Sequence, residues 1–360
     1  MQTSDSLLRT NSLEIGYSYR RKSHTILSNI NLIAKNGEFI CLLGRNGSGK
    51  STFLRTLAGM QKELKGTIYL TENSLQTFSN REKAKMIAVV LTERLQIGAM
   101  RGRDIVEFGR YPHTGWIGKL TPEDHEKVRH ALEDVGATHL ANREINQLSD
   151  GERQRLVIAR ALAQEPKLML LDEPSAFLDA PGRIELANLL RNLAHKRKIT
   201  VIAATHDLDI SLRTSDTIWL ITEKQRIESG SPEDLIANNS ISKAFSDEKT
   251  EFDNLKRTFK LKQNNHQRAF IEGEGESFEL AQSVLERTGW KVVFSPHESK
   301  IQISIKSDGT WKATVDDFEE IGKNFSELAS TAQKLIVTRP DSAPTVNPIE
   351  SPHDKPDEFQ

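Results

Sequence analysis

Apolar residues in the first two thirds of the chain form short runs that alternate with stretches of helical spacing. Runs at 39–43, 168–171, 200–204 and 218–222 suit buried parallel strands, whose two faces are both covered. Helical patterns follow the first run and recur over about 181–196, and the stretch 95–165 is mainly helical. Strands that alternate with helices predict an α/β fold with a parallel sheet.

A change of pattern near residue 247 divides the chain. The run 247–251 (Asp-Glu-Lys-Thr-Glu) reads as a linker between a domain at 1–247 and a small α+β domain at 248–338. In that second domain we expect a helix ended by Gly289, a hairpin turning at Asp308 and Gly309, and a last helix over 317–336. The tail, residues 339–360, is rich in proline and poor in apolar residues, so it is expected to be disordered.

Charge and cysteine content narrow the functional classes. The 360 residues include 49 basic and 50 acidic ones, so no nucleic-acid partner is expected from net charge. The single cysteine, Cys41, cannot form an internal disulfide, which fits a reducing cytoplasm. The chain shows no apolar run of about 18 residues and no signal-peptide pattern, so a cytoplasmic protein is expected.

The strongest chemical signal is the segment 44–51, Gly-Arg-Asn-Gly-Ser-Gly-Lys-Ser, which fits the phosphate-loop pattern G-x-x-x-x-G-K-[ST]. Its glycines let the backbone turn tightly and direct N–H groups at an anion. Lys50 can reach the β- and γ-phosphates, and Ser51 can ligate Mg²⁺. The residues expected to contact the nucleotide are Gly44, Arg45, Asn46, Gly47, Ser48, Gly49, Lys50, Ser51 and Thr52.

Two acidic residues directly follow the apolar run at 168–171. Buried strands of open parallel sheets present functional groups at their carboxyl ends, which here are Asp172 and Glu173. We expect Asp172 to hold Mg²⁺, directly or through water, and Glu173 to polarise an attacking water as a general base. The alternative is a strand that ends in a solvated turn, which the nearby phosphate loop makes less favourable.

The segment 148–154, Leu-Ser-Asp-Gly-Glu-Arg-Gln, resembles the signature Leu-Ser-Gly-Gly-Gln of the ATP-binding-cassette family, with Asp150 and Glu152 as departures. Ser149 and Glu152 also form an S-x-x-E capping box for the following helix, and both interpretations can hold. The resemblance implies that Ser149, Asp150, Gly151 and Glu152 face the γ-phosphate bound by a second subunit. The negative charge of Asp150 would then be offset by Arg45, Arg153 or Arg155.

Further segments fit this resemblance. Residues 175–179, which end in Asp179, look like the family's D-loop at the dimer seam, and His206 looks like the switch histidine that can donate to the γ-phosphate. Tyr17 resembles the aromatic residue that stacks on adenine, with Tyr19 as a rival. The family's glutamine loop has Thr92 or Glu93 in its expected place, and Gln96 is displaced.

The resemblance covers about residues 8–245 and implies a phosphate-loop NTPase domain of the ATP-binding-cassette type with a helical subdomain at about 95–165. It also implies ATP and Mg²⁺ as ligands, a head-to-tail dimer of two copies, and integral membrane permease partners that hold the chain at the inner face of the cell membrane. The segment 107–113 is similar to cassettes of importers for iron–siderophore, haem and vitamin B12.

Two alternatives remain at the level of the sequence. One is a soluble cassette ATPase that acts on ribosomes or DNA, which the single phosphate loop and the lack of sustained heptads disfavour. The other is a nucleotide-gated regulatory scaffold, which Asp172, Glu173 and His206 disfavour. The second domain shows no metal-ligand cluster, so regulatory ligand binding, dimer support and simple stabilisation all fit it; we favour a dimer or regulatory role.

Overall fold

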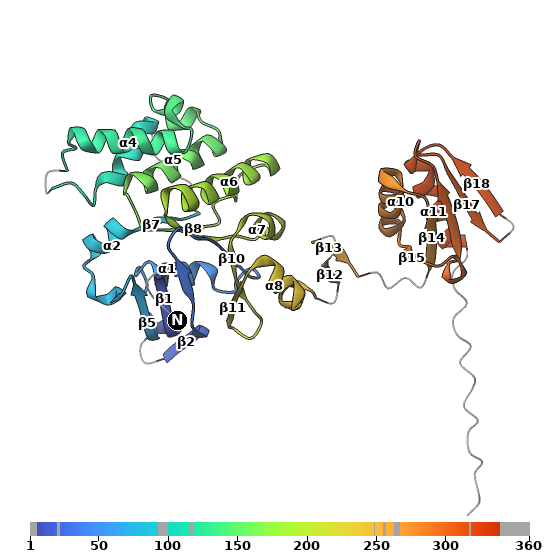
Figure 1. The fold of residues 1–360 in the computed structure, drawn as a ribbon, viewed down its shortest axis with the longest axis horizontal. Coiled ribbons are helices and arrows are strands. Elements are labelled where there is room, and N and C mark those ends of the chain that lie inside the picture. The colour runs from blue at the N-terminus through green and yellow to red at the C-terminus, as the bar shows by residue number, and fades with distance from the viewer. Residues whose placement is uncertain are drawn as a thin grey trace, which may run out of the picture. The chain divides into compact units, whose positions relative to one another are not determined.

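The computed structural model describes residues 6–19, 22–92, 100–115, 118–247, 249–254, 257–262, 267–316 and 318–338. The chain divides into two compact units between Lys260 and Leu261 (Figure 1). This boundary lies after the position expected near 247. The expected tail, 339–360, lies outside the described residues.

The central sheet of the first unit has the strand order β11-β10-β4-β9-β8-β7 within the described part of the chain. Neighbours from β10 to β7 are parallel, and β11 pairs antiparallel with β10. Its strands are β4 (Phe39–Leu43), β7 (Ile87–Val90), β8 (Leu168–Asp172), β9 (Thr200–Ala204), β10 (Thr217–Ile221) and β11 (Ile227–Gly230). The apolar runs therefore became parallel strands as predicted, because β4, β8 and β9 are buried along their whole length.

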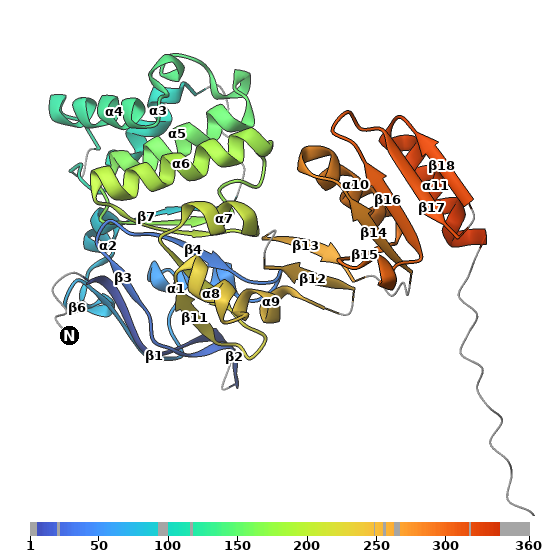
Figure 2. The ribbon, with the colours of Figure 1, turned by 45° about the vertical axis from the view of Figure 1, so that its right-hand side comes forward.

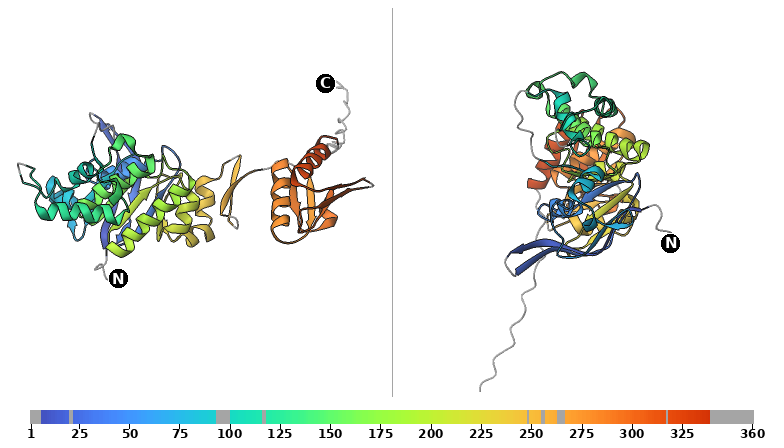
Figure 3. Two further views of the ribbon diagram at one scale, coloured as in Figure 1. Left: turned by 90° about the horizontal axis from the view of Figure 1, so that it is seen from above. Right: turned by 90° about the vertical axis from the view of Figure 1, so that its left-hand side faces the viewer.

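A second, antiparallel sheet covers one face of the central one. Its strands are β1 (Ser6–Tyr19), β2 (Lys22–Ile30), β3 (Ile33–Lys35), β5 (Lys65–Leu70) and β6 (Asn73–Ser74). β1 pairs with β2, β3 and β5, and the β1–β2 ribbon extends from the rest of this sheet (Figure 3, right). One apolar cluster joins this sheet to α1 and to alternate residues of β4, including Ile40 and Leu42.

Helices cover the other face of the central sheet (Figure 2). The opposite residues of β4, Phe39 and Cys41, pack there with apolar residues of α5 and α6. The helices of this unit are α1 (Lys50–Leu57), α2 (Asn80–Met86), α3 (Gly102–Glu107), α4 (Pro122–Asp134), α5 (Asp150–Ala163), α6 (Ala180–Arg197), α7 (Leu208–Thr214), α8 (Pro232–Ala237) and α9 (Ser240–Phe245). Helices α3, α4 and α5 form the helical region expected between 95 and 165. No helix in the described part of the chain has both the length and the apolar character needed to cross a bilayer.

The prediction of a linker over 247–251 was wrong for its last two residues. Thr250 and Glu251 belong to strand β12 (Thr250–Asp253), which pairs with β13 (Thr258–Leu261). The reason is Phe252, which is buried in the cluster that also contains Ala244 of α9. Burial of the Phe252 side chain thus stabilises strand β12, although most of its residues are polar.

The second unit is a two-layer α+β body. Its sheet has the order β15-β14-β16-β17-β18, and its core joins one face of that sheet to two helices. The elements are β14 (Arg268–Glu272), α10 (Gly275–Thr288), β15 (Lys291–Val293), β16 (Ile301–Ile305), β17 (Trp311–Val315), β18 (Phe318–Gly322) and α11 (Phe325–Thr338). The predicted hairpin at Asp308–Gly309 joins β16 to β17, and Gly309 adopts a φ of 82° there.

The prediction of one helix over 317–336 was wrong in its first part. Residues Phe318–Gly322 form strand β18, which pairs antiparallel with β17, and the helix begins only at Phe325. Phe318 and Ile321 have the i, i+3 spacing of a helix, but both side chains are exposed at the edge of the sheet. Pairing with β17 therefore determines that this segment is a strand, although its apolar spacing favours a helix.

Candidate functional site

The phosphate loop lies between β4 and α1, in the order that the sequence predicts. Gly47 and Gly49 adopt φ values of 77° and 101°, a region that favours glycine. A Cβ on Gly49 would lie 2.5 Å from the Ile26 side chain, whereas one on Gly47 would meet nothing within 4 Å. The loop is therefore packed tightly on its Gly49 side and open at Gly47, where an anion can approach the backbone.

Helix α1 begins directly after this loop, at Lys50. No side chain caps its first turn, so its N–H groups are available to an anion. The Oγ of Ser48 is buried and has no hydrogen-bond partner among the described residues. A buried hydroxyl without a partner is unfavourable unless a ligand satisfies it. Both observations fit a phosphate group at this position.

The acidic end of β8 lies beside the loop because β8, β9 and β4 are neighbours in the parallel sheet. Asp172 is 6% exposed, and its Oδ1 has no hydrogen-bond partner within the described ranges. Oxygen ligands are what Mg²⁺ prefers, so an orphaned buried carboxylate oxygen fits a metal ligand. Ser51, in the first turn of α1, is exposed and available as the second predicted ligand.

Glu173 forms the centre of a charged cluster with Lys50 and His206. Its Oε2 lies 2.7 Å from His206 Nδ1, and its Oε1 lies 3.8 Å from Lys50 Nζ. Lys50 Nζ also donates to the carbonyl oxygen of Gly44, at 2.9 Å. Glu173 has a φ of 49°, in the left-handed region that non-glycine residues rarely adopt. Three residues that are far apart in sequence thus meet at the carboxyl ends of β4, β8 and β9.

Ser149 begins α5 with the predicted capping box. Its Oγ accepts from Glu152 N at 3.2 Å, and Glu152 Oε2 accepts from Ser149 N at 2.8 Å. The backbone N–H of Ser149 is also the main cause that lowers the pKa of Glu152. Glu152 is therefore held ionised at the helix N-terminus, as the capping interpretation requires.

We expect Ser149→Ala to lower the free energy of unfolding by about 1 kcal/mol, because the N–H of Glu152 loses its side-chain acceptor. Chemical unfolding of the nucleotide-free chain, followed by circular dichroism, measures this change. Ser149→Thr keeps a hydroxyl at the same position and serves as the control. Equal unfolding midpoints for the alanine variant and the wild type would contradict the cap.

Arg153 is the arginine that offsets Asp150, at 3.3 Å. Arg155 instead pairs with Glu185 at 2.8 Å. The side chain of Arg45 lies near the phosphate loop, where it lines a cavity together with Gly47 and Ser48. Its guanidinium donates to the carbonyl oxygens of the last residues of α9 and its C-cap, namely Ala244, Phe245 and Ser246. Those carbonyls have no partner within the helix, which explains their attraction for a cation.

The segment 149–151 lies beside the predicted D-loop. Both line a cavity of about 360 Å³ that includes Gly151, Leu178 and Asp179. Asp179 caps α6 by accepting from Gly182 N at 3.0 Å. The structure thus brings these two sequence-predicted segments onto one surface of the chain.

Tyr17 is 55% exposed, and its hydroxyl lies 3.0 Å from Thr52 Oγ1 on α1. It lines a cavity of about 430 Å³ together with Gly47 and Ser48. An exposed ring tethered beside the phosphate loop fits a surface on which a base stacks. The side chain of Tyr19, the rival residue, lies outside the described residues.

The loop expected to carry a glutamine is described only at its start. Thr92 donates from Oγ1 to the carbonyl oxygen of Asp172 at 2.9 Å, so this residue links β7 to the acidic end of β8. Glu93 and Gln96 lie outside the described residues. The structure therefore gives Thr92 a definite contact at the site.

Asp207 is a positioning residue that the sequence analysis missed. It accepts from Ser175 Oγ at 2.8 Å and from Arg183 Nη1 at 3.0 Å. These bonds connect the segment 175–179 with the loop that carries His206. The available signal was its place directly after His206, because adjacent residues at the carboxyl end of a parallel strand often share a site.

Comparisons with known proteins agree with this geometry. A family profile described as ABC transporter matches residues 27–176. The chain is 38% identical over 258 residues to the ABC transporter ATP-binding protein MJ0873 of Methanocaldococcus jannaschii, covering 72% of this chain and 88% of that protein. It is 33% identical over 245 residues to the ferric enterobactin transport ATP-binding protein FepC of Escherichia coli, covering 68% of this chain and 89% of FepC.

Two solved structures are similar in fold. One is cbiO1 from Clostridium perfringens, part of the ABC transporter complex cbiONQ, with a TM-score of 0.58 and 30% identity over 66% of this chain and 93% of that one. The other is the dimeric post-hydrolysis state of the cassette MJ0796 bound to ADP and Pi, with a TM-score of 0.54 and 26% identity over 62% of this chain and 98% of that one.

Proposed function

Because the chain belongs to the family of ABC transporter ATP-binding proteins, we propose that its ATP hydrolysis energises an importer of iron–siderophore, haem or cobalamin. The cluster of Lys50, Glu173 and His206 at the carboxyl ends of three adjacent strands is the observation that supports this proposal most. The similarity to FepC favours a ferric siderophore among the three cargoes. The cargo itself is recognised by partner chains, so the test must include them.

Each residue of the site has a different role in ATP hydrolysis. The backbone of residues 44–49 and the first turn of α1 bind the phosphates, and Lys50 contributes its charge to them. Glu173 accepts a proton from the attacking water, and His206 orients Glu173 and can donate to the γ-phosphate. Asp172 and Ser51 would hold Mg²⁺, which supplies charge neutralisation on the phosphates.

A second copy of the chain is needed to complete each site in this proposal. Residues 149–152 share no hydrogen bond or ion pair with the phosphate loop of the same chain among the contacts of the described residues. Three of them, Ser149, Asp150 and Gly151, line a cavity beside Asp179. The solved MJ0796 cassette is a dimer with ADP and Pi, which supports a head-to-tail arrangement here. ATP at the seam would close the dimer, and loss of the γ-phosphate would loosen it.

Reconstitution tests the transport part of the proposal. The chain would be purified with candidate membrane subunits, placed in liposomes and supplied with ATP on its own side. We expect ATP-dependent uptake of one iron chelate or of cobalamin, measured with radiolabelled cargo. ATP hydrolysis that no membrane subunit alters would favour the soluble cassette ATPase, and the absence of any hydrolysis would favour the nucleotide-gated scaffold.

A further inference from the structure

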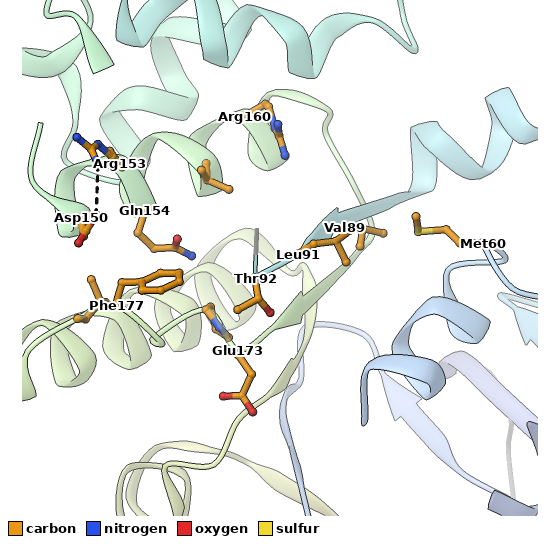
Figure 4. Close-up of a pocket in the computed structure, with 13 residues that line it drawn as sticks. Met60, Val89, Leu91, Thr92, Asp150, Arg153, Gln154, Arg160, Glu173 and Phe177 are labelled. Carbon is orange, nitrogen blue, oxygen red and sulfur yellow. Dashed lines mark hydrogen bonds and ion pairs between the residues drawn. The ribbon is translucent and has the colours of Figure 1, made fainter. Parts of the chain in front are cut away.

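None of the residues assigned above to ATP hydrolysis or to the dimer seam lies in the second unit. They belong to the first unit, as does a cavity of about 290 Å³ that Thr92 and Glu173 line beside the hydrolytic site (Figure 4). The second unit has a core of its own, in which the side chains of Trp290 and Trp311 are buried. A role for this unit beyond its own stability therefore depends on what its surface binds.

Strand β18 lies at one edge of the sheet of this unit (Figure 1). Its five residues pair with β17 in one regular register, without a bulge among these pairs. An edge strand presents unpaired N–H and C=O groups, and proteins usually protect such an edge with a bulge, a proline or a very short strand. The residues of β18 include none of these devices, whereas the opposite edge, β15, has only three residues.

The hydrogen-bond alternation of the sheet indicates which backbone groups of β18 face outward. Lys306 N donates to the carbonyl oxygen of Thr310 at 2.9 Å, where the hairpin between β16 and β17 begins. Because bonding directions alternate along an antiparallel strand, the even-numbered residues of β17 then bond to β16 and its odd-numbered residues bond to β18. Those odd-numbered residues pair with the even-numbered residues of β18. Glu319 and Ile321 therefore direct their N–H and C=O groups away from the sheet.

The side chains of Glu319 and Ile321 lie on the face of the sheet opposite the core, beside Thr314 and Lys312 of β17. Ile321 is 73% exposed, and Glu319 forms an ion pair with Lys312 at 2.6 Å. Lys323, two residues after Ile321, is also exposed. Along this edge an apolar side chain is thus flanked by a negative charge two residues before it and a positive charge two residues after it.

This arrangement of side chains is complementary to a second copy of itself. If two β18 strands pair antiparallel with Ile321 opposite Ile321 of the second copy, then Glu319 of each copy lies opposite Lys323 of the other. The outward backbone groups of Ile321 then meet each other, as an antiparallel ladder requires. Apolar pairs and pairs of opposite charge that face each other across strands are both favourable.

Other registers that join outward backbone groups lose this match. Two of them place Glu319 opposite Glu319 or Glu320 opposite Glu320, and like charges directly opposite each other are destabilising. A shift in the other direction leaves fewer strand residues opposite one another. In the register centred on Ile321, Glu320 instead lies opposite Gly322, which has no side chain to oppose it. Charge therefore selects one register.

The chain's own tail is a poor occupant for this edge. Residues 339–360 have a proline at every fourth position from 340 to 356, so three residues separate successive prolines. Proline has no N–H group to donate to a ladder. A second copy of β18, by contrast, offers a donor and an acceptor at Ile321 together with the complementary charges.

We propose that the second unit binds the second unit of another copy through β18, in an antiparallel pairing about a two-fold axis at Ile321. The pairing is isologous and joins two five-stranded sheets into one. The ladder is short, because Lys323 N already donates to Glu327 Oε2 at 2.9 Å. None of these residues belongs to the nucleotide site, so the contact does not depend on ATP. It keeps two copies at a high effective concentration when hydrolysis loosens the seam of the first units.

Sedimentation equilibrium of the full-length chain without nucleotide tests the contact. We expect a monomer–dimer equilibrium, which Ile321→Asp weakens by roughly tenfold because it places two carboxylates opposite each other. Phe294→Asp is the matched control, since Phe294 is a fully exposed apolar residue that follows β15 at the other edge. A wild-type chain that stays monomeric, or a dimer that Ile321→Asp does not weaken, would overturn the proposal. So would a dimer that Phe294→Asp weakens equally.

Exchange of the two charges tests the register. Lys323→Glu should weaken the dimer, because each new carboxylate then lies opposite Glu319 of the other copy. The double variant Glu319→Lys with Lys323→Glu should restore the affinity, since the two charges have changed places on both strands. Loss of the ion pair between Glu319 and Lys312 destabilises the double variant and cannot by itself restore association. A double variant that associates as weakly as Lys323→Glu does would show that this register is wrong.

Hydrogen exchange of the Ile321 amide identifies the occupant of the edge. Its protection should appear only at concentrations at which the chain is dimeric. Protection that persists in the monomer would assign the edge to a segment of the same chain and overturn the proposal. A chain that dimerises through β18 but does not hydrolyse ATP would contradict the proposed function alone, and a chain that hydrolyses ATP without this contact would contradict this inference alone.

Discussion

Replacement of Glu173 by glutamine is expected to lower the rate of ATP hydrolysis by about 10²–10⁴-fold, the usual contribution of a general base. The amide has nearly the same shape as the carboxylate but cannot accept a proton from water. ATP binding should persist, because the phosphate loop and Lys50 are unchanged. ATP-bound dimers should then accumulate, since the step that loosens the seam is blocked. Phosphate release and size-exclusion chromatography with ATP measure the two effects.

The control for this variant is Glu233→Gln, an exposed glutamate in the first turn of α8. It removes the same charge at a distance from the cluster and should hydrolyse ATP at the wild-type rate. Turnover of Glu173→Gln within a factor of two or three of wild type would remove Glu173 from the general-base role. The 2.7 Å contact with His206 would then be structural.

Lys50→Ala is expected to weaken ATP binding by roughly 10–100-fold, because a charge-assisted hydrogen bond contributes about 1.5–3 kcal/mol. The lysine side chain is 8% exposed and is held by the carbonyl oxygen of Gly44, so its ammonium group is already positioned near the loop. Hydrolysis should also become negligible at ordinary ATP concentrations. Isothermal titration calorimetry with a non-hydrolysable ATP analogue gives the affinity directly.

Lys196→Ala, at an exposed position in the last turn of α6, controls for the loss of one positive charge. Thermal unfolding of both variants without nucleotide shows whether the fold is preserved. If Lys50→Ala binds the analogue as tightly as wild type does, the segment 44–51 is not the phosphate site. Glu173→Gln and Lys50→Ala should lose hydrolysis for different reasons. Glu173→Gln should trap ATP, whereas Lys50→Ala should bind it weakly.

Local features of the site could be predicted from the sequence because their chemistry depends on neighbouring residues. The loop 44–51 carries its own glycines, lysine and hydroxyl, and the capping box of Ser149 and Glu152 spans one helical turn. The buried strands were recognisable from their continuous apolar runs, since a parallel strand is covered on both faces. Fold class followed from the alternation of these runs with helices.

Contacts between distant residues could not be predicted in this way. The pairing of Glu173 with His206 depends on β8 and β9 being adjacent, which the apolar pattern does not specify. The contact between the Arg45 guanidinium and the end of α9, about two hundred residues later in the chain, is a second example. Residues 318–322 were predicted to be helical from the spacing of two apolar residues. They form strand β18 instead, because they pair with β17.

By itself, the sequence determined that this protein has a phosphate-binding loop, a strand that ends in two acids, and a capped helix, because consecutive residues encode each of them. The tertiary structure alone decided which distant side chains meet: Lys50 and His206 at Glu173, and Arg45 at the end of α9. The physical reason is that electrostatic attraction acts over a few ångströms of space, and the order of strands in the sheet, not distance along the chain, sets those separations.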